Sequence, residues 1–171
     1  MDGIMETNGA APTEAQDHNR AFGGKYLTFQ LGAEQFGLEI PKVREIIGVL
    51  DVTKVPQTAS FVRGVINLRG KVIPVMDLRL RFGLPWREDD ERTCTIVVEV
   101  GEAGGQRRLM GIVVDQVREV VSVRDEDVEP TPSFGVELDT AYILGMAKLE
   151  GGVKILLDID RVVADSQLVL A

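Results

Sequence analysis

The segment FGLEIPKVREII at residues 36–47 recurs later in the chain as MGIVVDQVREVV at residues 110–121. The two copies are 74 residues apart, and most of their differing pairs exchange one aliphatic side chain for another. Four of the twelve pairs are identical: Gly37/Gly111, Val43/Val117, Arg44/Arg118 and Glu45/Glu119. Self-similarity at a fixed offset is the signature of an internal structural repeat, so it constrains the fold before any single element is considered.

A second recurrence follows the first in the same order. Residues 62–78 align with residues 143–159 at an offset of 81. Five pairs are identical there: Gly64/Gly145, Leu68/Leu149, Gly70/Gly151, Val72/Val153 and Asp77/Asp158. Together the alignments hold nine identities in 29 pairs, where ordinary residue usage gives roughly two. The sequence therefore predicts two β units of one design, at about residues 26–83 and 93–163.

Each unit contains a hairpin, a short helical turn, a second hairpin with a glycine turn, and a capped helix. Alternating apolar residues indicate the strands, which are rich in the chain's 23 valines. Val43, Ile46 and Ile47 fall at helical spacing after Pro41 and predict one or two helical turns. Asp77 and Asp158 are predicted helix caps. The expected strands are residues 26–31, 36–40, 52–55, 64–68, 72–75, 93–100, 109–114, 117–123, 143–149 and 153–157, with a long connection at 124–141.

Short, evenly spaced strands with glycine turns favour small closed barrels, because closure removes sheet edges. The runs at residues 95–100 and 111–114 are apolar at nearly every position. A strand with one solvated face alternates, so these strands are expected to be covered on both faces, by the second barrel or by a partner protein. The predicted fold class is all-β, with two five-stranded barrels and short helices.

Composition excludes several function classes. The net charge of −8 argues against binding to nucleic acid or to anionic lipid, both of which need a basic face. No apolar run is long enough to span a membrane, and no secretory signal is recognised. One cysteine and one histidine cannot build an ordinary zinc site or an internal disulfide.

Catalytic constellations are also missing from the sequence. There is no dinucleotide-binding fingerprint, no Walker A motif and no zinc-protease motif. His18 lies in a polar, glycine- and alanine-rich segment predicted to be a flexible tail, and Cys94 lies in a strand pattern typical of a small buried residue. The acidic run at residues 88–91 is expected to be a solvated loop. The sequence therefore predicts no catalytic group, metal or cofactor, and favours an interaction protein.

Several motifs, taken in order and spacing, resemble the CheW family of bacterial chemotaxis coupling proteins. They are Phe36-Gly-Leu-Glu-Ile with Val43-Arg-Glu-Ile, Phe61-Val-Arg-Gly-Val-Ile-Asn-Leu-Arg-Gly70, Pro74-Val-Met-Asp-Leu78, Gly111-Ile-Val-Val-Asp-Gln-Val117 and Ile155-Leu-Leu-Asp-Ile159. The resemblance runs from about Tyr26 to Val163. It implies a CheW-like domain at residues 25–165, between a tail at 1–24 and a C-terminal end at 166–171.

The resemblance implies two SH3-like barrels and allows the chain to cross between them. It further implies a non-catalytic cytoplasmic adaptor that joins the chemoreceptor tip to the regulatory domain of the histidine kinase CheA, without entering the membrane. It leaves room for contacts with other copies in rings. Family positions around the receptor groove match Val43, Glu45, Gly64, Arg69 and Val120. Positions at kinase contacts match Val43, Val72 and Phe134.

Three alternatives stay open at this point. The chain could serve a non-flagellar pathway, such as twitching or development, with the same adaptor chemistry. A small-barrel nucleic-acid binder is opposed by the charge and by an aromatic content of only 5%. An enzyme using carboxylates would require a deep polar cleft.

Overall fold

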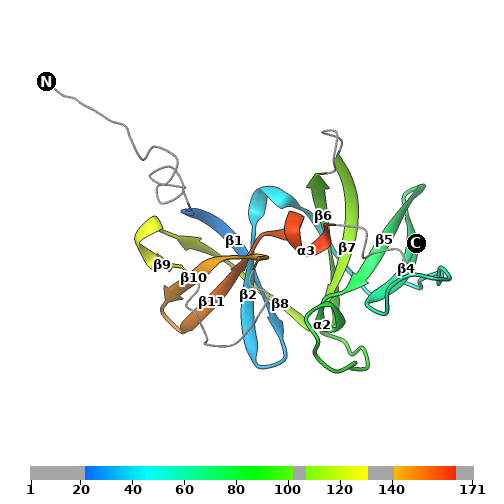
Figure 1. The fold of residues 1–171 in the computed structure, drawn as a ribbon, viewed down its shortest axis with the longest axis horizontal. Helices are drawn as coiled ribbons and strands as arrows, with labels where there is room; N and C mark the ends of the chain where they lie inside the picture. Colours follow the sequence, from blue (N-terminus) through cyan, green and yellow to red (C-terminus); the bar gives the residue numbers. More distant parts are fainter. Residues whose placement is uncertain (1–21, 102–106, 131–140, 165–171) are drawn as a thin grey trace, which may run out of the picture.

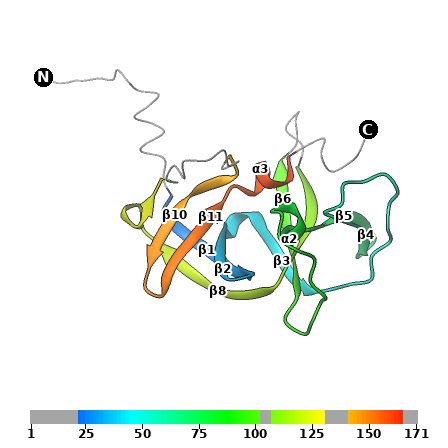
Figure 2. The same ribbon diagram turned by 60° about the horizontal axis from the view of Figure 1, so that its bottom comes forward.

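The computed structural model describes residues 22–101, 107–130 and 141–164. His18, Phe134 and the C-terminal end at 166–171 lie outside the described residues, as does almost all of the predicted tail. Figures 1 and 2 show two β-sheets side by side, with the short helix α3 beside their junction.

The first sheet has six strands in the order β8-β1-β2-β11-β10-β9, and the second has five in the order β3-β6-β7-β5-β4. The first comprises β1 (Gly24–Leu31), β2 (Glu34–Glu39), β8 (Gln116–Val123), β9 (Val128–Glu129), β10 (Ile143–Leu149) and β11 (Gly152–Leu157). The second comprises β3 (Val43–Gly48), β4 (Val62–Leu68), β5 (Lys71–Asp77), β6 (Cys94–Gly101) and β7 (Arg107–Val114). The helical elements are η1 (Ile40–Lys42), α2 (Leu78–Arg81), η2 (Asp125–Asp127) and α3 (Ile159–Val163).

The two sequence repeats exchange strands between the sheets. The repeat alignments make β2 equivalent to β7, β3 to β8, β4 to β10 and β5 to β11. The six-stranded sheet contains β1 and β2 of the first repeat together with β8, β10 and β11 of the second. The five-stranded sheet contains β6 and β7 of the second repeat together with β3, β4 and β5 of the first. The chain therefore crosses between the sheets after β2 and again after β7.

Strand register agrees with the repeat to the residue. Gly37 of β2 lies opposite Leu156 of β11, in a parallel pair. The equivalent Gly111 of β7 lies opposite Val75 of β5, again in a parallel pair. A Cβ on Gly111 would lie 2.9 Å from the side chain of Thr95, so this glycine permits close packing on the sheet face.

Three hydrophobic clusters fill the molecule. The largest lies between the sheets and includes Phe29, Ile96, Ile112 and Leu157. A second lines the inner face of the five-stranded sheet, and a third lines the inner face of the six-stranded sheet. In β6, Ile96 and Val98 belong to the cluster between the sheets, whereas Val97 belongs to the second cluster. The prediction that β6 is covered on both faces is therefore confirmed. The face that carries Ile96 and Val98 is covered by the other sheet.

All five strands of the second sheet contribute side chains to its inner cluster, which shows that the sheet is strongly curled. Within the described ranges, no hydrogen-bonded strand pair joins β3 to β4 or β8 to β9. The all-β class with two sheets is confirmed, and the closed barrels stay a prediction. The first sheet has six strands rather than five because the short β9 pairs with Met146 and Ala147 of β10.

Three predictions of local structure differ from the structure. The long connection predicted at residues 124–141 contains the 3-10 turn η2 and the short strand β9. The helix expected at residues 41–47 is limited to the 3-10 turn η1, and Val43–Gly48 forms the edge strand β3. The strand expected at residues 52–55 is a single bridge between Thr53 and Val65. The helix caps are as predicted: Asp77 accepts a hydrogen bond from the backbone N–H of Leu80, and Asp158 from that of Arg161.

Candidate functional site

Exposed apolar side chains mark two pairs of repeat-equivalent positions. Ile46 of β3 is 44% exposed, and Val120 at the equivalent position of β8 is 51% exposed. Val72 of β5 is 67% exposed, and its equivalent Val153 of β11 is 50% exposed. Single exposed aliphatic side chains are ordinary, but the same positions are left open in both repeats. They are the apolar candidates for contact with other proteins.

Edge strand β3 carries a bulge that sets the direction of its side chains. Val43 lies opposite Val98, and Glu45 lies opposite Val97, so one extra residue separates them on β3. Opposed residues of an antiparallel pair share a face, so Val43 faces the cluster between the sheets. Glu45 faces the opposite side, towards the inner cluster of the second sheet. The bulge thus puts an apolar and an acidic candidate residue on opposite faces of one edge strand.

Glu45 forms an ion pair with Arg69, which lies in the turn between β4 and β5. Strands β3 and β4 are the two edges of the five-stranded sheet, so this pair spans its open side. A hydrogen bond from the Arg69 guanidinium lowers the pKa of the Glu45 carboxyl. The same contact raises the pKa of Arg69. Both partners reach solvent, so the pair forms a charged edge on this side of the sheet.

The turn that presents Arg69 is a tight hairpin. Arg69 adopts a positive φ of 52° and Gly70 a φ of 88°. The side-chain oxygen of Asn67 accepts a hydrogen bond from the backbone N–H of Gly70 at 2.8 Å. Asparagine and glycine are typical of such turns, because one bonds the local backbone and the other tolerates positive φ.

Gly64 is buried in β4, where the lack of a side chain leaves room for a neighbouring segment. Its φ is +143°, and a Cβ there would lie 2.2 Å from the carbonyl oxygen of Thr53. Thr53 forms an antiparallel bridge with Val65 of β4 through two backbone hydrogen bonds, each of 2.9 Å. Gly145 occupies the equivalent position, where a Cβ would lie 2.7 Å from the side chain of Val128 in β9. In both sheets this glycine makes room for a short antiparallel segment that pairs with the strand.

The predicted site residues are thus placed as follows. Val43, Glu45, Gly64, Arg69 and Val72 all lie in the five-stranded sheet or its turns, and Glu45 and Arg69 are in direct contact. Val120 lies in the first sheet, opposite Leu27 of the cluster between the sheets. Phe134 lies outside the described residues. Ile46 was not among the predicted residues, although its alignment with Val120 was available to find it.

The acidic run at residues 88–91 is exposed to solvent, as expected, and ion pairs also hold it in place. Asp89 accepts hydrogen bonds from both terminal nitrogens of Arg63, at 2.8 and 2.9 Å. Asp90 forms an ion pair with Arg87 at 2.7 Å. The loop is therefore held against the second sheet, and it exposes Trp86, which is 64% accessible.

Among the described residues, no cluster of three or more His, Cys, Asp or Glu side chains could hold a metal ion. No helix in the described part of the chain is long and apolar enough to cross a membrane. Cys94 is a half-buried free thiol.

Comparison with known proteins gives a consistent result. The CheW-like domain family model matches residues 25–167. The chemotaxis protein CheW of Klebsiella aerogenes is 39% identical over 148 residues, which cover 86% of each chain. That of Rhizobium meliloti is 33% identical over 150 residues, covering 88% of this chain and 94% of the relative. The crystal structure of the scaffolding protein TtCheW from Thermoanaerobacter tengcongensis is similar with a TM-score of 0.74 and 35% identity, covering 85% of this chain and 96% of that one.

These matches span nearly all of the described fold, and they include both crossovers and both sheets. The chain therefore belongs to the CheW-like domain family, whose members are non-catalytic coupling and scaffolding proteins of chemotaxis signalling.

Proposed function

We propose that this chain joins the cytoplasmic tip of methyl-accepting chemoreceptors to the regulatory domain of the histidine kinase CheA. In this proposal it works in the cytoplasm, at membrane-associated receptor arrays. The observation that carries the site assignment is the ion pair between Glu45 and Arg69. It spans the open side of the five-stranded sheet, and the exposed Ile46 follows Glu45 along β3, on the other face of that strand.

The receptor surface in this proposal consists of Val43, Glu45, Gly64, Arg69 and Val120. A receptor tip is a helical hairpin, and an amphipathic helix docks through an apolar stripe with charged residues along its margins. Val43 and Val120 supply apolar side chains that face the junction between the sheets. Glu45 and Arg69 supply the charged margin, and Gly64, which has no Cβ, leaves room for the Thr53 segment that pairs with β4.

The kinase surface in this proposal consists of Val43, Val72 and Phe134. Val72 stands on the β4–β5 hairpin, opposite Asn67, with most of its side chain in solvent. A contact centred on such apolar side chains is modest in area. Modest contacts suit an array in which many linked copies raise the effective concentration of each partner. Contacts with further copies of this chain in rings belong to the same proposal.

Reconstitution tests the function directly. Receptor-bearing membranes and CheA from the same cell are mixed with or without this protein, and the rate of kinase phosphorylation is measured. A large increase that attractant suppresses is the expected result. No increase, together with no binding to the receptor or to the kinase domain, would overturn the proposal.

A further inference from the structure

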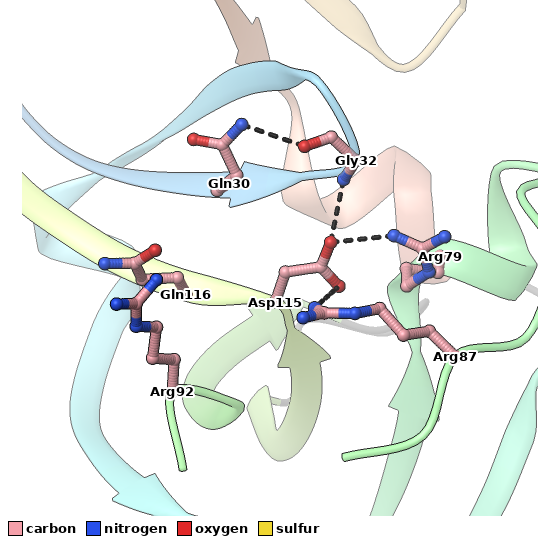
Figure 3. A pocket seen from close by; sticks show the side chains of 7 residues that line it. All are labelled: Gln30, Gly32, Arg79, Arg87, Arg92, Asp115 and Gln116. Carbon is pink, nitrogen blue, oxygen red and sulfur yellow. Dashed lines mark hydrogen bonds and ion pairs between the residues drawn. The ribbon is translucent and has the colours of Figure 1, made fainter. Parts of the chain in front are cut away.

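A polar pocket of about 340 Å³ lies where the chain leaves the second sheet for the first (Figure 3). Its walls come from the end of β1, helix α2, the loop after α2, and the junction between β7 and β8. The side chains that line it are Gln30, Arg79, Arg87, Arg92, Asp115 and Gln116. Three guanidinium groups therefore line a pocket with a single carboxylate, in a chain whose net charge is −8.

One of these arginines is fully explained by the fold. Asp115 Oδ2 accepts hydrogen bonds from the backbone N–H of Gly32 at 2.8 Å and from Arg79 Nη1 at 2.7 Å. Arg79 also donates to the carbonyl oxygen of Pro85 at 3.1 Å. These bonds tie α2 to the crossover between the sheets, and Figure 3 shows the two that Asp115 accepts.

The equivalent contact in the other repeat shows how many cations are needed to hold a crossover in place. At the other crossover, Asp160 of α3 accepts hydrogen bonds from Lys42 at 2.8 Å and from the backbone N–H of Gly101 at 3.0 Å. A single hydrogen-bonded cation is enough there. By this comparison, Arg87 and Arg92 exceed what the crossover requires.

Two of the side chains that line the pocket have hydrogen-bond donors with no acceptor among the described residues. The guanidinium of Arg92 and the side-chain amide of Gln116 form no hydrogen bond with any residue of the described ranges, and both line the pocket (Figure 3). Arg87 is held by Asp90 at 2.7 Å in a half-exposed pair, and its other contact, with Asp115 Oδ1, is long at 3.6 Å. The pocket thus offers the free guanidinium of Arg92 and the amide of Gln116 to an oxygen-bearing anion, with the paired guanidinium of Arg87 in the same lining. A guanidinium fork suits a carboxylate.

The polar lining favours a small charged group over an organic anion with a large apolar part. Pockets for organic ligands are mostly apolar with a few polar groups, and this one is polar on every named side chain. An exposed pair between one arginine and one free carboxylate strengthens binding by less than about fivefold. A carboxylate on a short peptide therefore binds here only weakly, and tight binding requires a larger contact around it.

We propose that this pocket receives an aspartate or glutamate side chain of a protein partner. None of the residues assigned above to receptor or kinase contact lines it, so it is an additional anchoring point. Because it lies at the crossover, an occupied pocket also fixes the approach angle of the partner relative to both sheets.

The first test needs no known partner. The protein labelled with ¹⁵N is titrated with a blocked tri-glutamate peptide, and amide shifts are recorded. Saturable shifts confined to Gly32, Arg92 and Gln116 are expected, with affinity lowered in Arg92→Ala. Arg107→Ala is the matched control, because Arg107 is exposed and lies about 23 Å away at the far end of β7. Shifts that are absent, or that are spread over the surface and unchanged in Arg92→Ala, overturn the proposal.

The second test uses the receptor cytoplasmic fragment and the kinase regulatory domain separately. Arg92→Glu is expected to lower affinity for one of them at least about fivefold. Arg107→Glu, with the same change of charge, stays within about twofold. Equal losses in the two variants overturn the proposal. If the unaltered protein binds neither partner, the proposed coupling function fails, whereas the peptide titration still decides the pocket.

Discussion

Arg79 of α2 and Asp160 of α3 occupy equivalent positions in the two repeats, and each is hydrogen-bonded to a residue of opposite charge at a crossover between the sheets. Arg79 binds Asp115, and Asp160 binds Lys42. In each tie the carboxylate also accepts a backbone N–H, from Gly32 or from Gly101. Both crossovers are thus held by an ion pair to the helix, with the positions of the cation and the carboxylate exchanged. The two crossovers therefore have the same connectivity but different electrostatics.

Removing Arg79 should destabilise the whole fold. The Asp115 side chain is only 11% exposed in the unaltered protein, and in Arg79→Ala its carboxylate loses its closest cation. We expect a loss of about 2 kcal/mol or more in the free energy of unfolding, measured by urea denaturation. The double variant Arg79→Ala/Asp115→Ala should lose less than the two single losses combined, because no charge is left without a partner. Strict additivity would show that the pair is not coupled.

Charge reversal at the open side of the second sheet should separate function from folding. Glu45→Lys or Arg69→Glu puts like charges together at a solvent-exposed site. We expect thermal and urea midpoints close to those of the unaltered protein, with a large loss of receptor coupling in the reconstituted kinase assay. The swapped double variant Glu45→Arg/Arg69→Glu restores the ion pair and serves as the control. A loss of stability as large as that of a core truncation would make the pair structural and contradict the proposed receptor surface.

The sequence repeat predicted more of this architecture than the local patterns did. Equivalent glycines, caps and hairpins recur at the expected positions. A feature that occurs in both copies of the repeat is better supported than a pattern that occurs once. The local pattern at residues 43–47 predicted a helix, and the reason is physical. The bulge after Val43 adds one residue to β3 and shifts the alternation, so the apolar side chains fall at helical spacing. Val117, Val120 and Val121 carry the same spacing in β8, where a strand was predicted.

The site was predicted only in part, since its contacts are long-range. The motifs gave Glu45 and Arg69 as separate candidates, and only the curl of the sheet brings them together. Likewise, Asp115 and Arg92 lie on distant segments, and no sequence pattern links them. Ile46 could have been found, because its repeat partner Val120 was already a candidate.

A methyl group at Gly64 should cost far more than one at Gly70. Both glycines have positive φ, so both substitutions strain the backbone. In Gly64→Ala, however, the new Cβ would lie 2.2 Å from the backbone oxygen of Thr53, whereas nothing lies within 4 Å at Gly70. We expect a loss of about 1 kcal/mol for Gly70→Ala and more than about 3 kcal/mol for Gly64→Ala, by urea denaturation. Equal losses would mean that the Thr53 segment moves away at little cost.

The charge-exchanged tie at Asp160 should appear in the pH dependence of stability. Burial disfavours the charged form of this carboxyl, but hydrogen bonds from Lys42 and from the Gly101 backbone outweigh it, so its pKa lies below the ordinary value. A carboxyl whose folded pKa is depressed adds stability that is fully present above its unfolded pKa, about 3.9, and is lost as the pH falls through the folded value. The unaltered protein should therefore exceed Asp160→Asn in free energy of unfolding at pH 7, and the difference should shrink below about pH 4. Lys42→Met should reduce the same difference at pH 7, because it removes the strongest donor that Asp160 has. A difference that stayed constant from pH 7 to pH 3 would show that the asparagine acts through packing and that the Asp160 charge contributes nothing to the tie.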